Sequence, residues 1–154
     1  GVELEVGGAK RDLTAVGVGV SQAFPLIVAF LLVPDDSIFI VEQPELHLHP
    51  AVQAALADFM ARARPNVATV VETHSDAFLT RLRRRVAEGI VERDRVRVTF
   101  VETIDGAART SDLQVSEYGD LSEWPTGFMS GSLDDATAIL RANIARHSDS
   151  TTHG

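Results

Sequence analysis

The chain has 154 residues, a formal net charge of −8 and a hydrophobic content of 45%, which is enough for one core of ordinary size. It contains no cysteine, which excludes disulfides and cysteine-based zinc sites and fits the cytoplasmic location that we expect. The acidic balance argues against a chain that binds nucleic acid over its whole surface, although it leaves room for a local basic patch.

The apolar runs and the start of the sequence lead to expectations about membrane association and processing of the protein. The longest apolar run, from Ala23 to Val33, includes Pro25 and is too short to span a bilayer, so we expect no membrane partner. No charged region with a cleavage site opens the chain, so we expect no signal peptide. The chain begins at Gly1 within a strand-like pattern, which suggests a fragment, a processed product or a trimmed chain.

Apolar periodicity and turn residues predict the elements of the first half of the chain. In chain order they are a strand over residues 2–6 that ends at Gly7-Gly8, a polar link, a helix from an N-cap at Ser21 to about Val33, a turn at residues 34–36, a buried strand over residues 38–41, and a helix from Ala51 to about Arg64 that follows Pro50.

The second half continues this alternation and then changes character. The predicted elements are a buried strand over residues 67–71, a helix over residues 76–87, a hairpin of strands 96–103 and 110–115 around Asp105-Gly106, a loop over residues 118–128, a helix over residues 133–146 and a disordered tail from His147. The order predicts an α/β sheet with helices on both faces, followed by a β-hairpin and a helix.

Polar side chains follow both buried strands. Glu42, Gln43 and Glu45 come after the first strand, and His74 and Asp76 come after the second. The carboxyl ends of adjacent parallel strands meet at one edge, where open α/β sheets bind their ligands, so we expect these side chains in one crevice. A carboxylate there suits Mg²⁺ and phosphate chemistry, whereas the plainer alternative is an acid that caps nearby amides.

Three other features of the sequence leave alternatives open. No glycine-rich phosphate loop that ends in Lys-Ser or Lys-Thr occurs in the 154 residues. Four arginines between residues 81 and 85 are consistent with either a solvated helix end with favourable charge or a basic patch. Glu45, His47 and His49 also suggest a transition-metal site, because alternation places both histidines on one side of an extended segment.

The motifs resemble the C-terminal half of an ABC-type ATPase head, in the branch of SMC-like, RecF-like and prokaryotic defence AAA-type ATPases. Residues 38–44 resemble its Walker B strand, residues 45–50 its D-loop, residues 73–75 its switch-histidine motif and residues 17–22 a diverged signature motif. The resemblance spans about residues 15 to 130 and implies a P-loop NTPase-like, mainly parallel sheet. It divides the chain into an ATPase part, residues 1–130, and a C-terminal helix with its tail, residues 131–154.

The resemblance implies roles for the residues after the first buried strand. Glu42 takes the place of the acid that coordinates Mg²⁺, where aspartate is usual. Gln43 stands where the family has the glutamate that polarises the attacking water; glutamine cannot accept that proton but can orient water. Glu45 is the nearest substitute base, or else a charged residue at a loop or subunit contact.

The remaining roles concern the nucleotide. The resemblance assigns His74 to sensing the γ-phosphate, and Gly19, Ser21 and Gln22 to a nucleotide held by another subunit. It adds His49 to the nucleotide-binding residues. The alternatives are a satisfied polar histidine at position 74 and a glycine-permitted turn before a core helix at residues 17–22.

The leading interpretation is therefore a module that binds and hydrolyses ATP with Mg²⁺ and that is incomplete without the Walker A half. Its expected partners are a second copy of the chain or that missing half, with a nuclease effector or DNA as further candidates. The main alternative is a non-catalytic interaction or dimerisation module, which the missing phosphate loop and Gln43 favour. A metal-dependent nuclease is a third, and it requires a tight carboxylate cluster away from the first buried strand.

Overall fold

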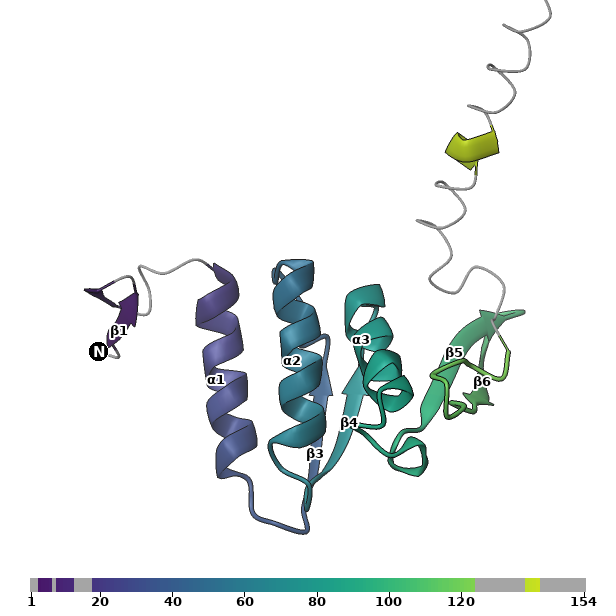
Figure 1. Cartoon of the computed structure of the whole chain (residues 1–154), viewed down its shortest axis with the longest axis horizontal. Helices are drawn as coiled ribbons and strands as arrows, with labels where there is room; N and C mark the ends of the chain where they lie inside the picture. Colours follow the sequence, from purple (N-terminus) through teal and green to yellow (C-terminus); the bar gives the residue numbers. More distant parts are fainter. Residues whose placement is uncertain (1–2, 7, 13–17, 124–137, 142–154) are drawn as a thin grey trace, which may run out of the picture. The chain divides into compact units, whose positions relative to one another are not determined.

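A computed structural model of the chain describes residues 3–6, 8–12, 18–123 and 138–141. It divides the chain into two compact units, which are described separately. The first consists of Gly1–Arg97 with Val115–Asp120, and the second of Val98–Gln114 with Leu121–Gly154 (Figure 1). In the described part of the chain, no helix is long and apolar enough to cross a membrane.

The chain opens with an antiparallel hairpin of β1 (Glu3–Val6) and β2 (Ala9–Asp12). The strand predicted over residues 2–6 is confirmed, but the prediction of a polar link after it was wrong. Gly8, at φ 78°, lies in the tight turn between Val6 and Ala9, where a positive φ suits glycine. The sequence of β2, Ala-Lys-Arg-Asp, lacks the apolar alternation that marks a half-buried strand. The sequence therefore did not predict its pairing with β1.

A β-α-β unit forms the centre of the first unit. β3 (Ile38–Glu42) and β4 (Ala68–Glu72) are parallel, and α2 (Pro50–Arg62) connects them. The register runs from Ile38 opposite Ala68 to Glu42 opposite Glu72, so both strands end at the same edge. Parallel strands need a crossover of this kind, and the predicted order of strand, helix and strand is confirmed here.

Three helices pack on one face of this pair: α1 (Val18–Leu32), α2 and α3 (Asp76–Ala87) (Figure 1). Phe30 of α1 is fully buried, and its ring lies 5.2 Å from that of Phe39 and 5.5 Å from that of Phe59, measured between centroids in edge-to-face arrangements. The buried centre of this core consists of Leu48, Leu56, Ala57, Met60 and Phe78.

The opposite face of β3 and β4 is exposed. Ile38 and Ile40 retain 67% and 70% of their accessible surface, and Val70 retains 53%. The α/β class is confirmed. The prediction that both strands are buried does not hold in the described part of the chain, because one face of the pair is exposed. Both strands carry apolar residues on the side that faces the helices and on the side that faces away, so the sequence pattern could not reveal that one face is open.

Both ends of α1 lie against other elements. The helix begins at Val18, so Ser21 lies in its first turn and donates its Oγ–H to Val18 O at 2.8 Å; the prediction that Ser21 caps the helix was wrong. At the other end, Arg64 donates hydrogen bonds to main-chain carbonyls at Leu31 (2.5 Å) and Val33 (2.7 Å). These bonds satisfy carbonyls that a helix end leaves without partners.

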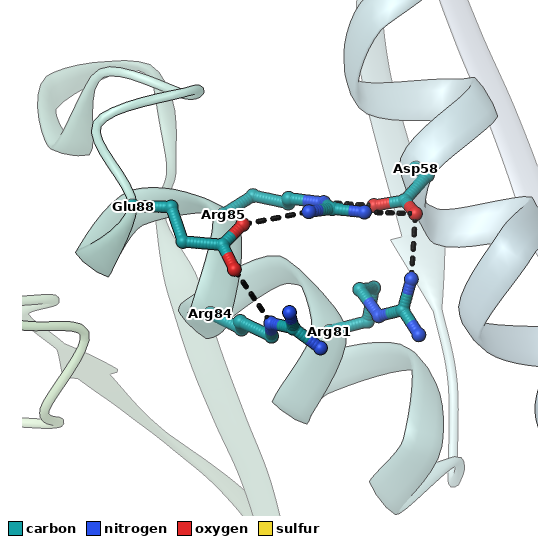
Figure 2. Close-up of polar contacts among 5 residues, drawn as sticks. All are labelled: Asp58, Arg81, Arg84, Arg85 and Glu88. Atoms are coloured by element: carbon teal, nitrogen blue, oxygen red, sulfur yellow. Dashed lines mark hydrogen bonds and ion pairs between the residues drawn. The ribbon is translucent and has the colours of Figure 1, made fainter.

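The arginines of residues 81–85 bind neighbouring acceptors, mostly carboxylates. Arg85 Nε and Nη2 bind the two oxygens of Asp58 at 2.6 and 2.7 Å, and Arg81 Nη1 binds Asp58 Oδ2 at 2.7 Å (Figure 2). Arg84 and Arg85 both bind Glu88. The hydrogen bond from Arg85 lowers the pKa of Asp58, and burial opposes this shift.

This network joins α2 to α3 through a carboxylate whose side chain is only 21% exposed. Arg83 donates to Gly119 O at 2.7 Å, so each arginine of the cluster has an acceptor within the first unit. The structure therefore favours the structural interpretation of the cluster over a basic patch.

The second unit contains an antiparallel hairpin of β5 (Val98–Ile104) and β6 (Ala107–Leu113), which confirms the predicted one. Asp105 and Gly106 occupy the turn with φ of 52° and 77°, the positive pair that a two-residue hairpin loop requires. A short 3-10 helix at Arg93–Arg95, in the first unit, was not predicted. Residues 138–141 are helical, whereas the rest of the predicted last helix, residues 124–128 and the tail lie outside the described residues.

Candidate functional site

The segments that follow β3 and β4 lie at one edge of the parallel pair. The register sets Glu42 opposite Glu72, and the main-chain N–H of Gln43 donates to Glu72 O at 2.8 Å. Both glutamates lie on the exposed face. The predicted meeting of two strand ends is thus present, with a carboxylate from each strand at the carboxyl edge where open α/β sheets bind ligands.

The segment after β3 is a compact series of turns. Gln43 and His47 have positive φ values of 44° and 59°, and main-chain bonds join Leu46 N to Gln43 O and Leu48 N to Glu45 O. Non-glycine residues rarely adopt such φ values, and they concentrate where the surrounding structure imposes the conformation. The segment is not extended, so the alternation that suggested a site for a transition metal on His47 and His49 does not hold.

Glu45 links the two loops. Its side chain is buried, with 7% of the residue exposed, and its Oε1 accepts the main-chain N–H of His74 at 2.8 Å. Its other oxygen, Oε2, is buried and has no hydrogen-bond partner among the described residues. A carboxylate on the loop after β3 therefore holds the main chain of the loop after β4.

Gln53 and Ser75 form a second link between the same loops, which sequence reasoning missed. Gln53 Nε2 donates to Leu48 O at 2.9 Å, and Gln53 Oε1 accepts the hydroxyl of Ser75 at 2.6 Å. Ser75 Oγ also accepts the N–H of Phe78 at 3.0 Å and so caps α3. The N-cap position of Ser75 could have been found from the sequence, whereas nothing marks Gln53.

The His74 side chain points into solvent. Its imidazole is 80% exposed, and Nε2 lies 3.3 Å from Glu72 Oε1, whose side chain is 50% exposed. An imidazole in this position can donate to an anion that arrives from outside the chain. Glu72, two residues before His74 and the strand partner of Glu42, was not among the predicted site residues.

The start of α1 lies against the loop after β3. A Cβ added at Gly19 would lie 3.0 Å from His47 O and 3.0 Å from Leu48 Cδ2, so glycine permits this approach. Gln22 is exposed on α1, and His49 caps α2 by accepting the N–H of Ala51 on Nδ1 at 3.3 Å. The structure thus gives His49 a capping contact and Gly19 a packing contact.

The candidate site therefore consists of two turns joined by a buried carboxylate, with Glu42, Gln43 and His74 at their surface. Among the residues that the structure describes, no group of three or more histidine and acidic side chains is arranged to hold a metal ion. Glu42 can supply one oxygen ligand to Mg²⁺, which commonly takes one or two protein carboxylates together with phosphate oxygens and water.

The fold is α/β and P-loop NTPase-like, with the candidate site at the carboxyl edge of its parallel strands. Comparison with solved structures agrees: one chain, from work described as "Structural biochemistry of ATP-driven dimerization and DNA stimulated activation of SMC ATPases", matches with a TM-score of 0.54 and 19% sequence identity. The match covers 74% of this chain and 66% of that one, so the present chain spans just under two thirds of the solved chain. Likeness at this identity establishes the fold alone.

A comparison with protein families also matches the part of the chain that contains the candidate site. Residues 5–80 match the family described as "AAA domain, putative AbiEii toxin, Type IV TA system". The matched range includes β3, α2, β4 and both loops of the candidate site. No curated protein matches the chain. The chain is thus similar over residues 5–80 to this AAA-domain family and similar in fold to the solved SMC ATPase chain.

Proposed function

We propose that this chain supplies the Mg²⁺-binding acid and the γ-phosphate-sensing histidine of an ATP-hydrolysing domain. In this proposal Glu42 holds Mg²⁺, His74 donates to the γ-phosphate, and Gln43 orients the attacking water. A phosphate-binding loop, which the 154 residues lack, comes from another segment or another chain. The observation that carries the proposal is the junction of the loops after β3 and β4 through Glu45 and His74.

This geometry suits phosphate chemistry for an electrostatic reason. The exposed imidazole of His74 lies on the loop after β4, and the exposed Glu42 ends β3; Gln43 N–H donates to Glu72 O between these strand ends, and Glu45 Oε1 accepts the His74 N–H. A donor for a phosphate oxygen and an acid for a metal ion are the two groups that a Mg-nucleotide requires from such an edge. Positioned groups of this kind stabilise transition-state charge without reorganisation during the reaction.

The signature-like segment has a separate part in the proposal. We assign Gly19, Ser21 and Gln22 to a contact with nucleotide held by a second subunit, and His49 to the nucleotide-binding residues. The packing of Gly19 against His47 O supports a fixed position for the start of α1 beside the loop after β3. ATP would then join two such domains, and hydrolysis would release them. A nuclease effector or DNA is the further partner that such a movement would serve.

A non-catalytic interaction module is the second candidate, and the open face of β3 and β4 favours it. Ile38, Ile40 and Val70 form an exposed apolar surface, and surfaces of this kind commonly mark contacts with another protein segment. Gln43 also stands where a base would be expected. In this alternative the strand pair is completed by a partner, and Glu42 and His74 have no role in hydrolysis.

Calorimetry with Mg-ATP distinguishes the two. We expect the 154-residue polypeptide to bind Mg-ATP poorly and to hydrolyse none, because it lacks the loop that surrounds the β- and γ-phosphates. Together with the segment or chain that carries the phosphate loop, it should bind with a dissociation constant of about 1 mM or tighter, the range common for enzyme substrates. Micromolar affinity of the 154-residue polypeptide alone, or no binding in the presence of that segment or chain, would contradict the proposal.

A further inference from the structure

Glu45 lies where a substitute base would be needed, but its contacts indicate a different use. Its Oε1 is already an acceptor for the main-chain N–H of His74 at 2.8 Å, and only 7% of the residue is exposed. A general base has to reach the water whose proton it takes, directly or through one further water. The buried carboxylate of Glu45 instead contacts the backbone of the residue that carries the imidazole.

The second carboxylate oxygen of Glu45, Oε2, gives further evidence about the role of this side chain. Oε2 is buried without a hydrogen-bond partner among the described residues, and an unsatisfied buried acceptor destabilises the folded state. Buried acceptors without a partner are uncommon in folded proteins, so this oxygen calls for an explanation. Such exceptions in folded proteins concentrate at functional positions, where one contact matters more than the stability of the segment.

Gln53 and Ser75 restrain the same two loops from the side of α2. Gln53 donates to Leu48 O at 2.9 Å and accepts the Ser75 hydroxyl at 2.6 Å, one residue beyond His74. Glu45, Gln53 and Ser75 are called the loop bridge below. It holds the main-chain N–H of His74 and the hydroxyl of the next residue, Ser75, while the His74 side chain is 80% exposed. His74 thus has a restrained main chain and an exposed ring that lies 3.3 Å from Glu72 Oε1.

We infer that Glu45 is a positioning residue, which acts through the main chain of His74 and not as the base. The loop bridge sets where the imidazole of His74 meets the γ-phosphate and makes the loops after β3 and β4 move as one body. This inference rests on the proposed role of His74 in ATP hydrolysis. It also predicts a result for Glu45→Gln that differs from the one a base would give, because glutamine keeps an acceptor oxygen at the Oε1 position.

The test compares Glu45→Gln with Glu45→Ala in the full-length gene product by two readouts. We expect amide hydrogen exchange at His74 to accelerate at least about tenfold in Glu45→Ala and to stay within about threefold of wild type in Glu45→Gln. ATP turnover should be at least about tenfold lower in Glu45→Ala than in Glu45→Gln. Glu92, an exposed glutamate at the start of the 3-10 helix, provides matched controls as Glu92→Gln and Glu92→Ala.

Equal losses of turnover in the two Glu45 variants, with exchange at His74 unchanged in both, would overturn the inference and identify Glu45 as the base. If Glu45→Ala does not fold, Gln53→Ala tests the same bridge from its other side and should also accelerate exchange at His74 and Ser75. Wild-type turnover in His74→Ala would contradict the proposed function instead. Exchange at His74 would still report whether the loop bridge holds its main chain.

Discussion

Glu42→Gln should abolish Mg²⁺-dependent ATP turnover in the full-length gene product, and His74→Ala should slow it at least about thirtyfold, a loss of roughly 2 kcal/mol or more in transition-state stabilisation. Glutamine cannot provide the anionic oxygen that Mg²⁺ prefers, and alanine cannot donate to the γ-phosphate. Nucleotide affinity should change less than turnover, because both groups act mainly on charge that develops during the reaction. Steady-state rates and equilibrium binding measure the two effects separately.

The control for these variants is Glu92→Gln, which removes an exposed carboxylate elsewhere in the first unit and should leave the rate at the wild-type value. Gln43→Glu adds a further comparison: if Gln43 only orients water, restoring a carboxylate there should raise turnover. Unchanged rates in both Glu42→Gln and His74→Ala would falsify the assignment of the site.

Asp58→Asn should lower the free energy of unfolding by about 1–3 kcal/mol at pH 7, because it removes the anionic partner of Arg81 and Arg85 at the contact between α2 and α3. This expected loss is smaller than that for a fully buried ion pair, because the Asp58 and Arg85 side chains are 21% and 18% exposed. Urea unfolding of wild type and variant measures the difference. Asp94→Asn, at a side chain that is 88% exposed, is the matched control and should change it by less than about 0.5 kcal/mol.

The effect of Asp58→Asn should depend on pH in one direction. The hydrogen bond from Arg85 lowers the pKa of Asp58 in the folded state, so the carboxylate stabilises the fold above its unfolded pKa of about 4. That contribution is lost as pH falls through the lower folded-state value. The difference between wild type and Asp58→Asn should therefore be constant from pH 7 to about 5 and shrink below about 4. A difference that grows as the pH falls would contradict the ion-pair account.

The elements that could be predicted are those whose sequence carries a strong local signal. Apolar runs that end at Glu42 and Glu72 marked the parallel strands, and Asp105-Gly106 marked the hairpin turn with both φ values positive. β2 was missed because its short polar sequence lacks the apolar alternation that marks a strand. The start of α1 was placed too late because Ser21 resembles a cap, whereas its hydroxyl bonds back to Val18 inside the first turn.

The meeting of the two strand ends could be predicted from the sequence, whereas the contacts that join their loops could not. The ends of two parallel strands have to meet, so the proximity of Glu42, Gln43 and His74 follows from topology. The burial of Glu45 and its bond to the His74 main chain depend on the positive φ at Gln43, which turns the chain back. Side-chain contacts between residues far apart in sequence, such as that of Gln53 with Ser75, produce no periodic sequence pattern from which they could be predicted.

Hydrogen exchange of the full-length gene product, with and without a non-hydrolysable Mg-ATP analogue, tests most directly whether the loops after β3 and β4 form one nucleotide site. We expect the analogue to slow exchange at residues 43–49 and 73–76 and to leave the β5–β6 hairpin unchanged, because bound nucleotide suppresses local opening only in the segments it contacts. Bound analogue with no change in either loop would contradict the account.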